Sequence, residues 1–337
     1  MKSRKERLFA LLSLIFGFVL FPASAASETI DEVYKKALKE EGVLNCYCSL
    51  AQINAAKIFP QFEKRFPGIK INHVDATADK LAARAITEAR GGRTIADVLE
   101  FGLENISQVH EQGLVSEKPL PEAAAFPDNL KGSFWTAQNL IFFIGAWNTN
   151  LVKKEEAPDS FDDFADPRWK GKLIADPRDA ELVIGLMHKH NSLEKARAVL
   201  RKIAANNVEF HKGHSQLAEL LVAGQASACF TCYSHHYPPR IQKGAPLGYF
   251  LTEGLGNIIG IAVMKDPPHP KTALLFARWA VSEEGQKVYA EGGRTPAHPN
   301  IEPIEPVRPK KIYAIGVDDI KQFPKYVKIW KEIFNLR

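Results

Sequence analysis

Two closely spaced cysteine pairs are the residues of this 337-residue chain that are best suited to chemistry. They are Cys46-x-Cys48 and Cys229-x-x-Cys232, and the sequence contains no other cysteine. In an oxidising compartment an even number of cysteines favours disulfides, here with three connectivities. Cys46 and Cys48 would lie on the same face of an extended strand, which is an awkward geometry for bonding to each other. A Cys229–Cys232 disulfide, buried thiols and a soft-metal site are the alternatives.

The Cys-x-x-Cys spacing also raises the hypothesis of an exported thiol-disulfide or metal-handling protein. In thiol-disulfide oxidoreductases the first sulfur sits at the amino terminus of a helix, which lowers the pKa of its thiol. Cys229 follows a segment with a strand pattern, and two prolines at 238 and 239 discourage a helix soon afterwards. The redox function is therefore kept only as the alternative.

A second group of candidate ligands lies in the segment Tyr233-Ser-His-His-Tyr237. Together with Glu100, the side chains of Tyr233, His235, His236 and Tyr237 offer oxygen and nitrogen atoms to a metal ion. The same side chains are equally suited to stacking on an organic ligand or to hydrogen bonding with it, since neutral histidine both donates and accepts. Metal binding and organic-ligand binding therefore both remain open.

Two arginines close to predicted loops are candidates for binding an anion. Arg178 follows Asp176-Pro177, and Arg294 follows two glycines. The planar guanidinium group suits carboxylate or phosphate, and helix amino termini add to such sites. The alternative for each arginine is a surface salt bridge.

Strand and helix patterns alternate along the chain, which predicts an α/β protein with a mainly parallel sheet. In such sheets ligands bind beyond the carboxyl ends of the strands. We therefore expect residues 47–51, which include Tyr47, Cys48 and Ser49, and residues 100–102 to line a cleft. The expected strands are 43–50, 69–74, 95–99, 172–175, 226–231 and 257–264. The expected helices are 29–41, a segment through 59–66, 79–90, 182–190, 192–205, 215–223 and 271–281.

The first 25 residues have the three parts of a cleavable secretory signal. Four basic residues precede an apolar run of 14 residues, 8–21, and Ala23-Ser-Ala25 forms a small-residue cleavage site. The apolar run is shorter than the roughly 20 residues that a membrane-spanning helix needs. We therefore predict cleavage after Ala25 and a free periplasmic protein. Removing this segment lowers the formal charge from +5 to +2, and no dense basic tract indicates nucleic-acid binding.

Several segments, in order and spacing, resemble the bacterial ABC-transporter solute-binding proteins that include the ferric-ion-binding proteins and their organic-anion-binding relatives. The most telling is Ser282-Glu-Glu-Gly-Gln286 followed by Gly293-Arg-Thr-Pro296. The others are Tyr47-Cys-Ser-Leu50, residues 62–71, Ala96-Asp-Val98 and residues 166–172. The resemblance implies a two-lobed type II periplasmic-binding-protein fold with a ligand cleft between the lobes. It also implies non-covalent capture of a solute rather than catalysis, with no required cofactor.

The resemblance does not extend to an intact ferric site. The ferric relatives use a histidine after the first strand, where this sequence has Leu50 and Ala51. Glu100 comes about two residues early for their glutamate, and no two tyrosines are adjacent near Tyr233. The ligand is therefore expected to be either a metal ion or its chelate, or a small organic anion.

The expected organisation is a signal peptide (1–25), a first lobe (26–150), a second lobe (151–255), and a return to the first lobe with C-terminal helices (256–337). The expected partner is an ABC permease of the inner membrane. We expect a monomer that binds no nucleic acid.

Overall fold

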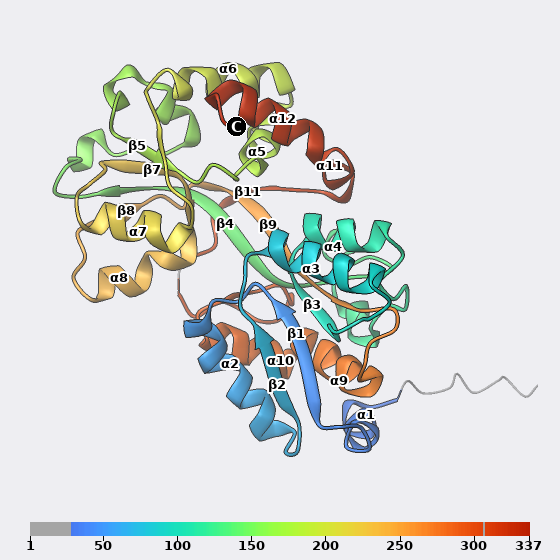
Figure 1. Cartoon of the computed structure of the whole chain (residues 1–337). Helices are drawn as coiled ribbons and strands as arrows, with labels where there is room; N and C mark the ends of the chain where they lie inside the picture. The colour runs from blue at the N-terminus through green and yellow to red at the C-terminus, as the bar shows by residue number, and fades with distance from the viewer. Residues whose placement is uncertain (1–27, 306) are drawn as a thin grey trace, which may run out of the picture.

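Two long antiparallel strands, β4 (Thr136–Asn148) and β9 (Glu253–Val263), run through the centre of the molecule and join two lobes (Figure 1). This computed structural model describes residues 28–305 and 307–337. The predicted signal segment, 1–25, lies outside the described residues. Because β4 and β9 belong to both lobes, a single sheet passes from one lobe into the other, with the strand order β2-β1-β3-β9-β4-β7-β5-β6.

The first lobe is built on three parallel strands next to β9. A large apolar cluster that includes Phe62, Phe66 and Trp279 packs between this sheet and its helices. The strands are β1 (Val43–Cys48), β2 (Lys70–Val74) and β3 (Val98–Gly102), and β10 (Thr295–Pro296) pairs with β4. The helices are α1 (Ile30–Ala37), α2 (Gln52–Arg65), α3 (Ala78–Arg90), α4 (Leu103–Glu111), α9 (Pro270–Val281) and α10 (Glu283–Glu291).

The second lobe continues the same sheet beyond β4. Separate apolar clusters cover its two faces, one around Phe230 and Trp330 and the other around Leu217 and Tyr237. The strands are β5 (Leu173–Ala175), β6 (Glu209–Phe210), β7 (Ala228–Tyr233) and β8 (Leu247–Tyr249). The helices are α5 (Glu181–His190), α6 (Leu193–Ala204), α7 (His214–Val222) and α8 (Pro238–Gln242).

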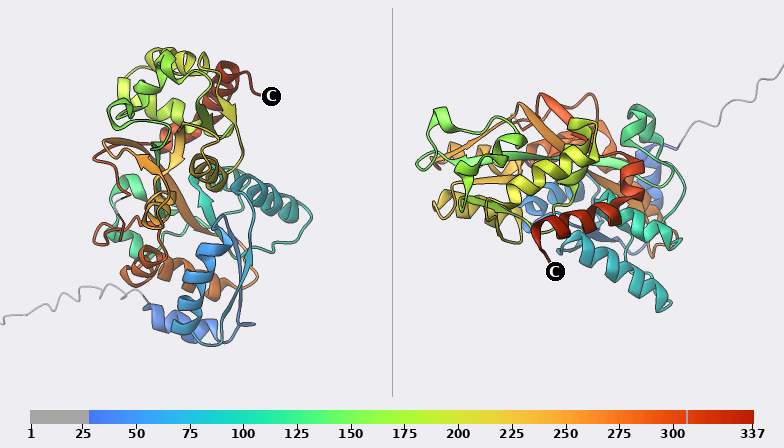
Figure 2. Two further views of the ribbon diagram at one scale, coloured as in Figure 1. Left: turned by 90° about the vertical axis from the view of Figure 1, so that its left-hand side faces the viewer. Right: turned by 90° about the horizontal axis from the view of Figure 1, so that it is seen from above.

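The C-terminal segment lies against the second lobe and also touches the first. Strand β11 (Lys311–Ala314) pairs in parallel with β9, and α11 (Val317–Lys321) contacts α4. Helix α12 (Phe323–Phe334) then packs on α5 and α6, as Figure 2 shows from above. Trp330 anchors α12, since it is buried and its indole donates to the Pro177 carbonyl at 2.9 Å. The lobe boundaries expected from the sequence stay a prediction.

Local sequence signals explain several element ends. Thr29 and Glu32 form the expected capping box, in which each side chain binds the backbone amide of the other residue. Gly42 has φ +71°, and a Cβ there would clash with the Gly68 carbonyl where the chain enters β1. Strand β3 begins at Val98, three residues later than expected. None of the helices formed by the described residues is both long and apolar enough to cross a bilayer.

Candidate functional site

A cavity of about 360 Å³ lies between the two lobes, beside the crossing strands. We call it the interlobe cavity. The first lobe contributes the loop after β1, the start of α3 and the start of α4, while the second contributes the loops after β5 and β6 and the end of β7. Its polar lining residues are Ser49, Thr77, Asp79, Glu104, Asn105, Arg178, Asp179, Glu181, His214, Tyr233 and Asn257, and Ile141, Ile259 and Phe323 are among its apolar ones. Most of the polar residues lie at strand ends and helix starts, where α/β sheets bind ligands, whereas Ile141, Asn257 and Ile259 belong to the crossing strands β4 and β9.

Arg178, an expected anion ligand, lines this cavity but already has a partner. Its guanidinium donates to both carboxylate oxygens of Asp176, at 2.8 and 2.6 Å. Burial acts to raise the pKa of Asp176, but hydrogen bonds from Arg178 and Gly213 outweigh it and hold that pKa below its ordinary value. The hydrogen bonds that Arg178 donates to Asp176 likewise raise the pKa of Arg178. The positive charge of Arg178 is therefore matched by a fully buried carboxylate.

Tyr233 and His214 form a stacked pair in the wall of the second lobe, with ring centroids 3.4 Å apart. Nδ1 of His214 contacts the Thr231 carbonyl at 3.1 Å, and Nε2 lies 3.4 Å from Asp179. Burial raises the pKa of Tyr233 well above its ordinary value, and the nearby carboxylates raise it further. The phenol therefore keeps its proton at neutral pH and offers a hydroxyl group rather than a phenolate.

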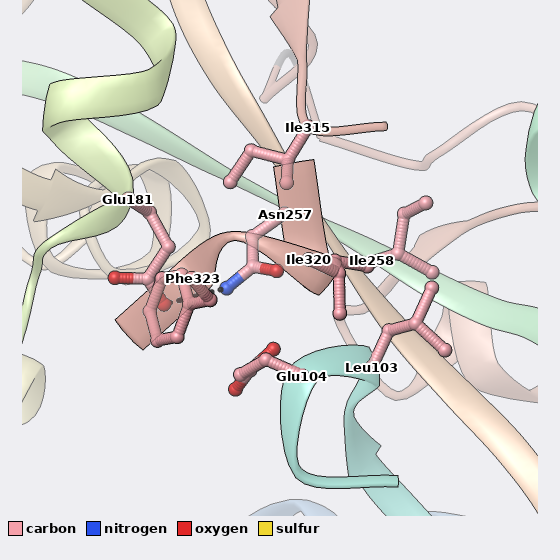
Figure 3. A pocket seen from close by; sticks show the side chains of 8 residues that line it. All are labelled: Leu103, Glu104, Glu181, Asn257, Ile258, Ile315, Ile320 and Phe323. Atoms are coloured by element: carbon pink, nitrogen blue, oxygen red, sulfur yellow. Dashed lines mark hydrogen bonds between the residues drawn. The ribbon is translucent and has the colours of Figure 1, made fainter. Parts of the chain in front are cut away.

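Three carboxyl groups from both lobes approach the interlobe cavity. Glu104 extends from the start of α4, while Glu181 lies at the start of α5 on the opposite side (Figure 3). Asp179, two residues before α5, also lines the cavity. Asn257 donates to Glu181 Oε1 at 3.4 Å, whereas Glu181 Oε2 and Asp179 Oδ2 have no hydrogen-bond partner among the described residues. Burial raises the pKa of Glu104 to about 7. Burial and the negative charge of Glu104 raise the pKa of Glu181 well above its ordinary value.

The residues expected beside β1 and β3 do not all reach the interlobe cavity. Ser49 lines it, because it is the first residue beyond β1. Tyr47 does not line the cavity, and its hydroxyl donates to the Glu88 carboxylate of α3 at 2.7 Å. Cys48 and Glu100 are buried inside the first lobe, where the Tyr289 hydroxyl donates to Glu100 at 2.7 Å. The structure therefore places Tyr47, Cys48 and Glu100 in the core, because they belong to the strands themselves and not to the loops beyond them.

The Tyr233-to-Tyr237 segment is divided between different environments. His235 and His236 line a second cavity of about 720 Å³, together with Lys57, Arg240 and Lys243. Burial lowers the pKa of His235 well below its ordinary value and that of His236 to about 3. Arg294 donates to the neutral ring of His235 at 3.2 Å. Tyr237 lies in an apolar cluster with a fully buried ring, so the four side chains do not converge on one ligand site.

The four cysteines pair locally. Cys229 and Cys232 form a disulfide within β7, with their Cα atoms 5.9 Å apart. Cys46 and Cys48 are also joined, although an extended strand was expected to disfavour this pairing. Their Cα atoms lie 5.4 Å apart. That distance falls within the usual range for disulfides. All four side chains are fully buried, so the structure offers no exposed sulfur for thiol-disulfide exchange.

One group in the described part of the chain converges closely enough to hold a metal ion, and it is formed by Cys46, Cys48 and Glu100. Their ligand atoms lie within 4.8 Å of one another, and all three side chains are buried. Because the two sulfurs are bonded to each other, they are not available as thiolate ligands. This group does not border the interlobe cavity.

Residues outside the sequence prediction complete the interlobe cavity. They include Glu104, Asp179, Glu181 and His214, with Phe323 from the C-terminal segment. Asp179 follows the predicted strand 172–175 by four residues. The rule that ligands bind beyond the carboxyl ends of strands could therefore have identified it. Glu104 similarly follows the predicted Glu100–Gly102 segment. Nothing in the sequence near Phe323 indicated its position, because it depends on how α12 packs.

The profile of the family described as "Bacterial extracellular solute-binding protein" matches residues 57–312, which is more than half of the chain. The chain belongs to this family. The resemblance noted in the sequence is thereby confirmed, as is the prediction of a solute receptor rather than an enzyme. This solute-binding protein is the substrate-binding component of an ABC importer, which implies a permease partner and a small ligand.

Known proteins similar to this solute-binding protein are named for iron and for a sugar phosphate. It is 25% identical to Iron uptake protein A1 of Synechocystis sp. over 85% of this chain and 84% of that protein. It resembles iron-bound HitA from Pseudomonas aeruginosa with a TM-score of 0.74 and 20% identity, covering 86% of this chain and 99% of that one. AfuA from Actinobacillus pleuropneumoniae, with fructose-6-phosphate bound, gives a TM-score of 0.70 and 22% identity, covering 88% and 97%. These structural matches confirm the two-lobed α/β binding-protein fold.

Proposed function

We propose that this solute-binding protein captures its ligand in the interlobe cavity and delivers it to an inner-membrane ABC permease. It acts in the periplasm, as a monomer, after residues 1–25 are removed. The observation that carries the proposal is that side chains from both lobes face one cavity. A ligand that touches both lobes favours their closed arrangement, and a permease that recognises this arrangement can distinguish loaded from empty receptor.

The side chains that the sequence suggested as ferric ligands do not gather in this cavity. Ferric sites need hard, anionic oxygen donors. Tyr233 lines the cavity, but Tyr237 is buried in the core and Glu100 is hydrogen-bonded to Tyr289 inside the first lobe. The names of the relatives above therefore supply candidate ligands to test and not an assignment.

A thermal-shift screen of the protein from residue 26 onward tests the proposal. The screen includes ferric, cupric and zinc ions, carboxylates, phosphonates, sugar phosphates, polyols and amines. A ligand at 100 times its dissociation constant stabilises the folded state by about 2.7 kcal/mol. We expect one of these classes to raise the melting temperature without forming product.

Two tyrosine variants locate the site. Tyr233→Ala removes a side chain that lines the interlobe cavity, whereas Tyr34→Ala removes one from α1, outside it. We expect the ligand-dependent rise in melting temperature to vanish in the Tyr233 variant and to persist in the Tyr34 variant. Equal stabilisation of both variants would place the site elsewhere, and turnover without a partner protein would contradict a receptor function.

A further inference from the structure

Building on this function, we propose that the solute is an organic cation whose ammonium group binds between Glu104 of the first lobe and Glu181 of the second. The inference rests on the proposed function, because it requires the interlobe cavity to be the binding site. It names the sign and chemical class of the solute. This class differs from the iron and the sugar phosphate of the relatives described above.

The first support is the position of the two carboxylates. Glu104 is the second residue of α4 and Glu181 is the first residue of α5, so each lies at a helix amino terminus that faces the cavity. Helix amino termini are the usual sites for binding anions. Here the chain supplies its own carboxyl groups at both positions, and once ionised they present a negative surface to the ligand.

The arrangement of Glu104 depends on a glycine. A Cβ at Gly102 would overlap the Glu104 carboxyl group, so this side chain lies back over the glycine at the start of α4. Figure 3 shows Glu104 and Glu181 entering the same pocket from α4 and α5 on opposite sides. An ammonium group between them would contact one carboxylate from each lobe.

The second and independent support is unused hydrogen-bonding capacity. Glu181 is 9% exposed and Asp179 3% exposed, and each has one carboxylate oxygen without a partner among the described residues. A buried carboxylate without a partner costs free energy that a bound cation would recover. In the ionised form these oxygens lack a hydrogen-bond donor, and a primary ammonium group donates up to three hydrogen bonds.

Positive side chains in the cavity do not offset this negative surface. Arg178 is held by Asp176 in a two-point interaction, and His214 lies against Asp179. Asp79 also lines the cavity. The cavity thus combines several acidic groups with a single arginine that is already paired.

The size and apolar lining favour an organic cation over a metal ion. A smaller pocket of about 10 Å³, with room for one water-sized group, shares Glu104, Glu181, Asn257 and Phe323 with the interlobe cavity. An ammonium head matches that size. Leu103, Ile315, Ile320 and the ring of Phe323 line the same pocket. The carboxylates of Glu104, Glu181 and Asp179 are not among the side chains that converge closely enough to hold a metal ion.

The proposal predicts a distinctive pH dependence. The charged groups facing Glu181 are Glu104, Asp179 and Asp176, the last of which is paired with Arg178. In the empty protein burial raises the pKa of Glu104 to about 7, so this group carries a proton below that pH. Cation binding requires the ionised form, and it should therefore release a proton and tighten as the pH rises from 6 to 8. Each pH unit below the pKa weakens binding up to about tenfold per proton released.

The experiment measures binding of ethanolamine, putrescine, cadaverine and lysine to the protein from residue 26 onward, by calorimetry at pH 6 and pH 8. The variants are Glu181→Gln and Glu104→Gln, with Glu155→Gln as the matched control on an exposed turn. We expect at least one amine to bind more tightly at pH 8, and each cavity variant to weaken it on the order of 100-fold. The control should bind like the natural protein.

Melting temperature separates a lost ligand contact from a folding defect. The raised pKa of buried Glu181 costs stability at high pH, and glutamine cannot ionise. At pH 8 the ligand-free Glu181→Gln variant should therefore melt at a higher temperature than the natural protein while losing the amine-dependent rise in melting temperature. No binding by any of the four amines, or binding that survives both cavity variants, overturns the inference. If fructose 6-phosphate or ferric ion binds instead and Tyr233→Ala abolishes that binding, the proposed function stands and the cationic class is wrong.

Discussion

Replacing Glu100 with glutamine should remove a pH-dependent cost to the stability of the fold. Glu100 is 1% exposed, and burial raises the pKa of its carboxyl group from 4.5 to about 7, against the opposing effects of Tyr289 and Arg294. The folded protein thus holds this proton up to about pH 7, whereas the unfolded chain releases it near 4.5. The free energy of unfolding therefore falls as the pH rises between these two values.

The expected size of this effect follows from the pKa difference. At about 1.36 kcal/mol per pKa unit, Glu100 alone lowers the free energy of unfolding by about 3 kcal/mol between pH 4 and pH 8. Glutamine keeps an oxygen that accepts from Tyr289 but cannot ionise. The variant should therefore gain about 3 kcal/mol relative to the natural protein over this pH range.

Urea unfolding at pH 4, 5, 6, 7 and 8 gives the required comparison, with Glu155→Gln as a surface control. The informative quantity is the difference in unfolding free energy between variant and natural protein, since it cancels groups that titrate alike in both. This difference should change most steeply between about pH 5 and pH 6.5, where the folded protein holds the proton and the unfolded chain has released it. A difference that is constant with pH, or that moves in favour of the natural protein at pH 8, would refute the reasoning.

Two further predictions follow from the packing and the cysteines. Gly185→Ala should destabilise the protein by more than about 1 kcal/mol, although alanine is the better helix former, because its Cβ would overlap the side chain of Leu255 where α5 packs on β9. Urea unfolding measures this change, and an unchanged midpoint would contradict the packing described. Thiol titration of the denatured, unreduced protein should find no free thiol, and reduction should release four. Any thiol that reacts before reduction would argue against the local pairs.

Most of the elements could be predicted from the sequence because their signals are local. Thr29 and Glu32 mark the start of α1, and Gly42 marks the turn into β1. Helices α5, α6 and α9 begin and end within two residues of the predicted bounds. The 13-residue strand β4 was not predicted, because it is buried along almost its whole length and lacks the alternation that identifies a strand with one exposed face.

The cavity could be predicted only as far as the rule on strand ends reaches. That rule placed Ser49 correctly, but Tyr47 and Cys48 belong to β1 itself and point into the core. Burial of Glu100 and Tyr237 depends on contacts with distant segments such as α10, which no local pattern reveals. Arg178 and Asp176 are only two positions apart in the sequence. That their pairing matches the positive charge of Arg178 inside the cavity is visible only in the folded structure.

The passage of β4 and β9 through both lobes has a consequence for how the chain folds. Phe143 of β4 pairs with Leu255 of β9, about 110 residues later in the sequence, so neither lobe can complete its sheet until most of the chain is present. Pairing between distant segments slows folding, because a long loop must close before its contacts form. A chain that folds slowly stays unfolded longer after synthesis, which suits a protein that we propose crosses the inner membrane before it folds.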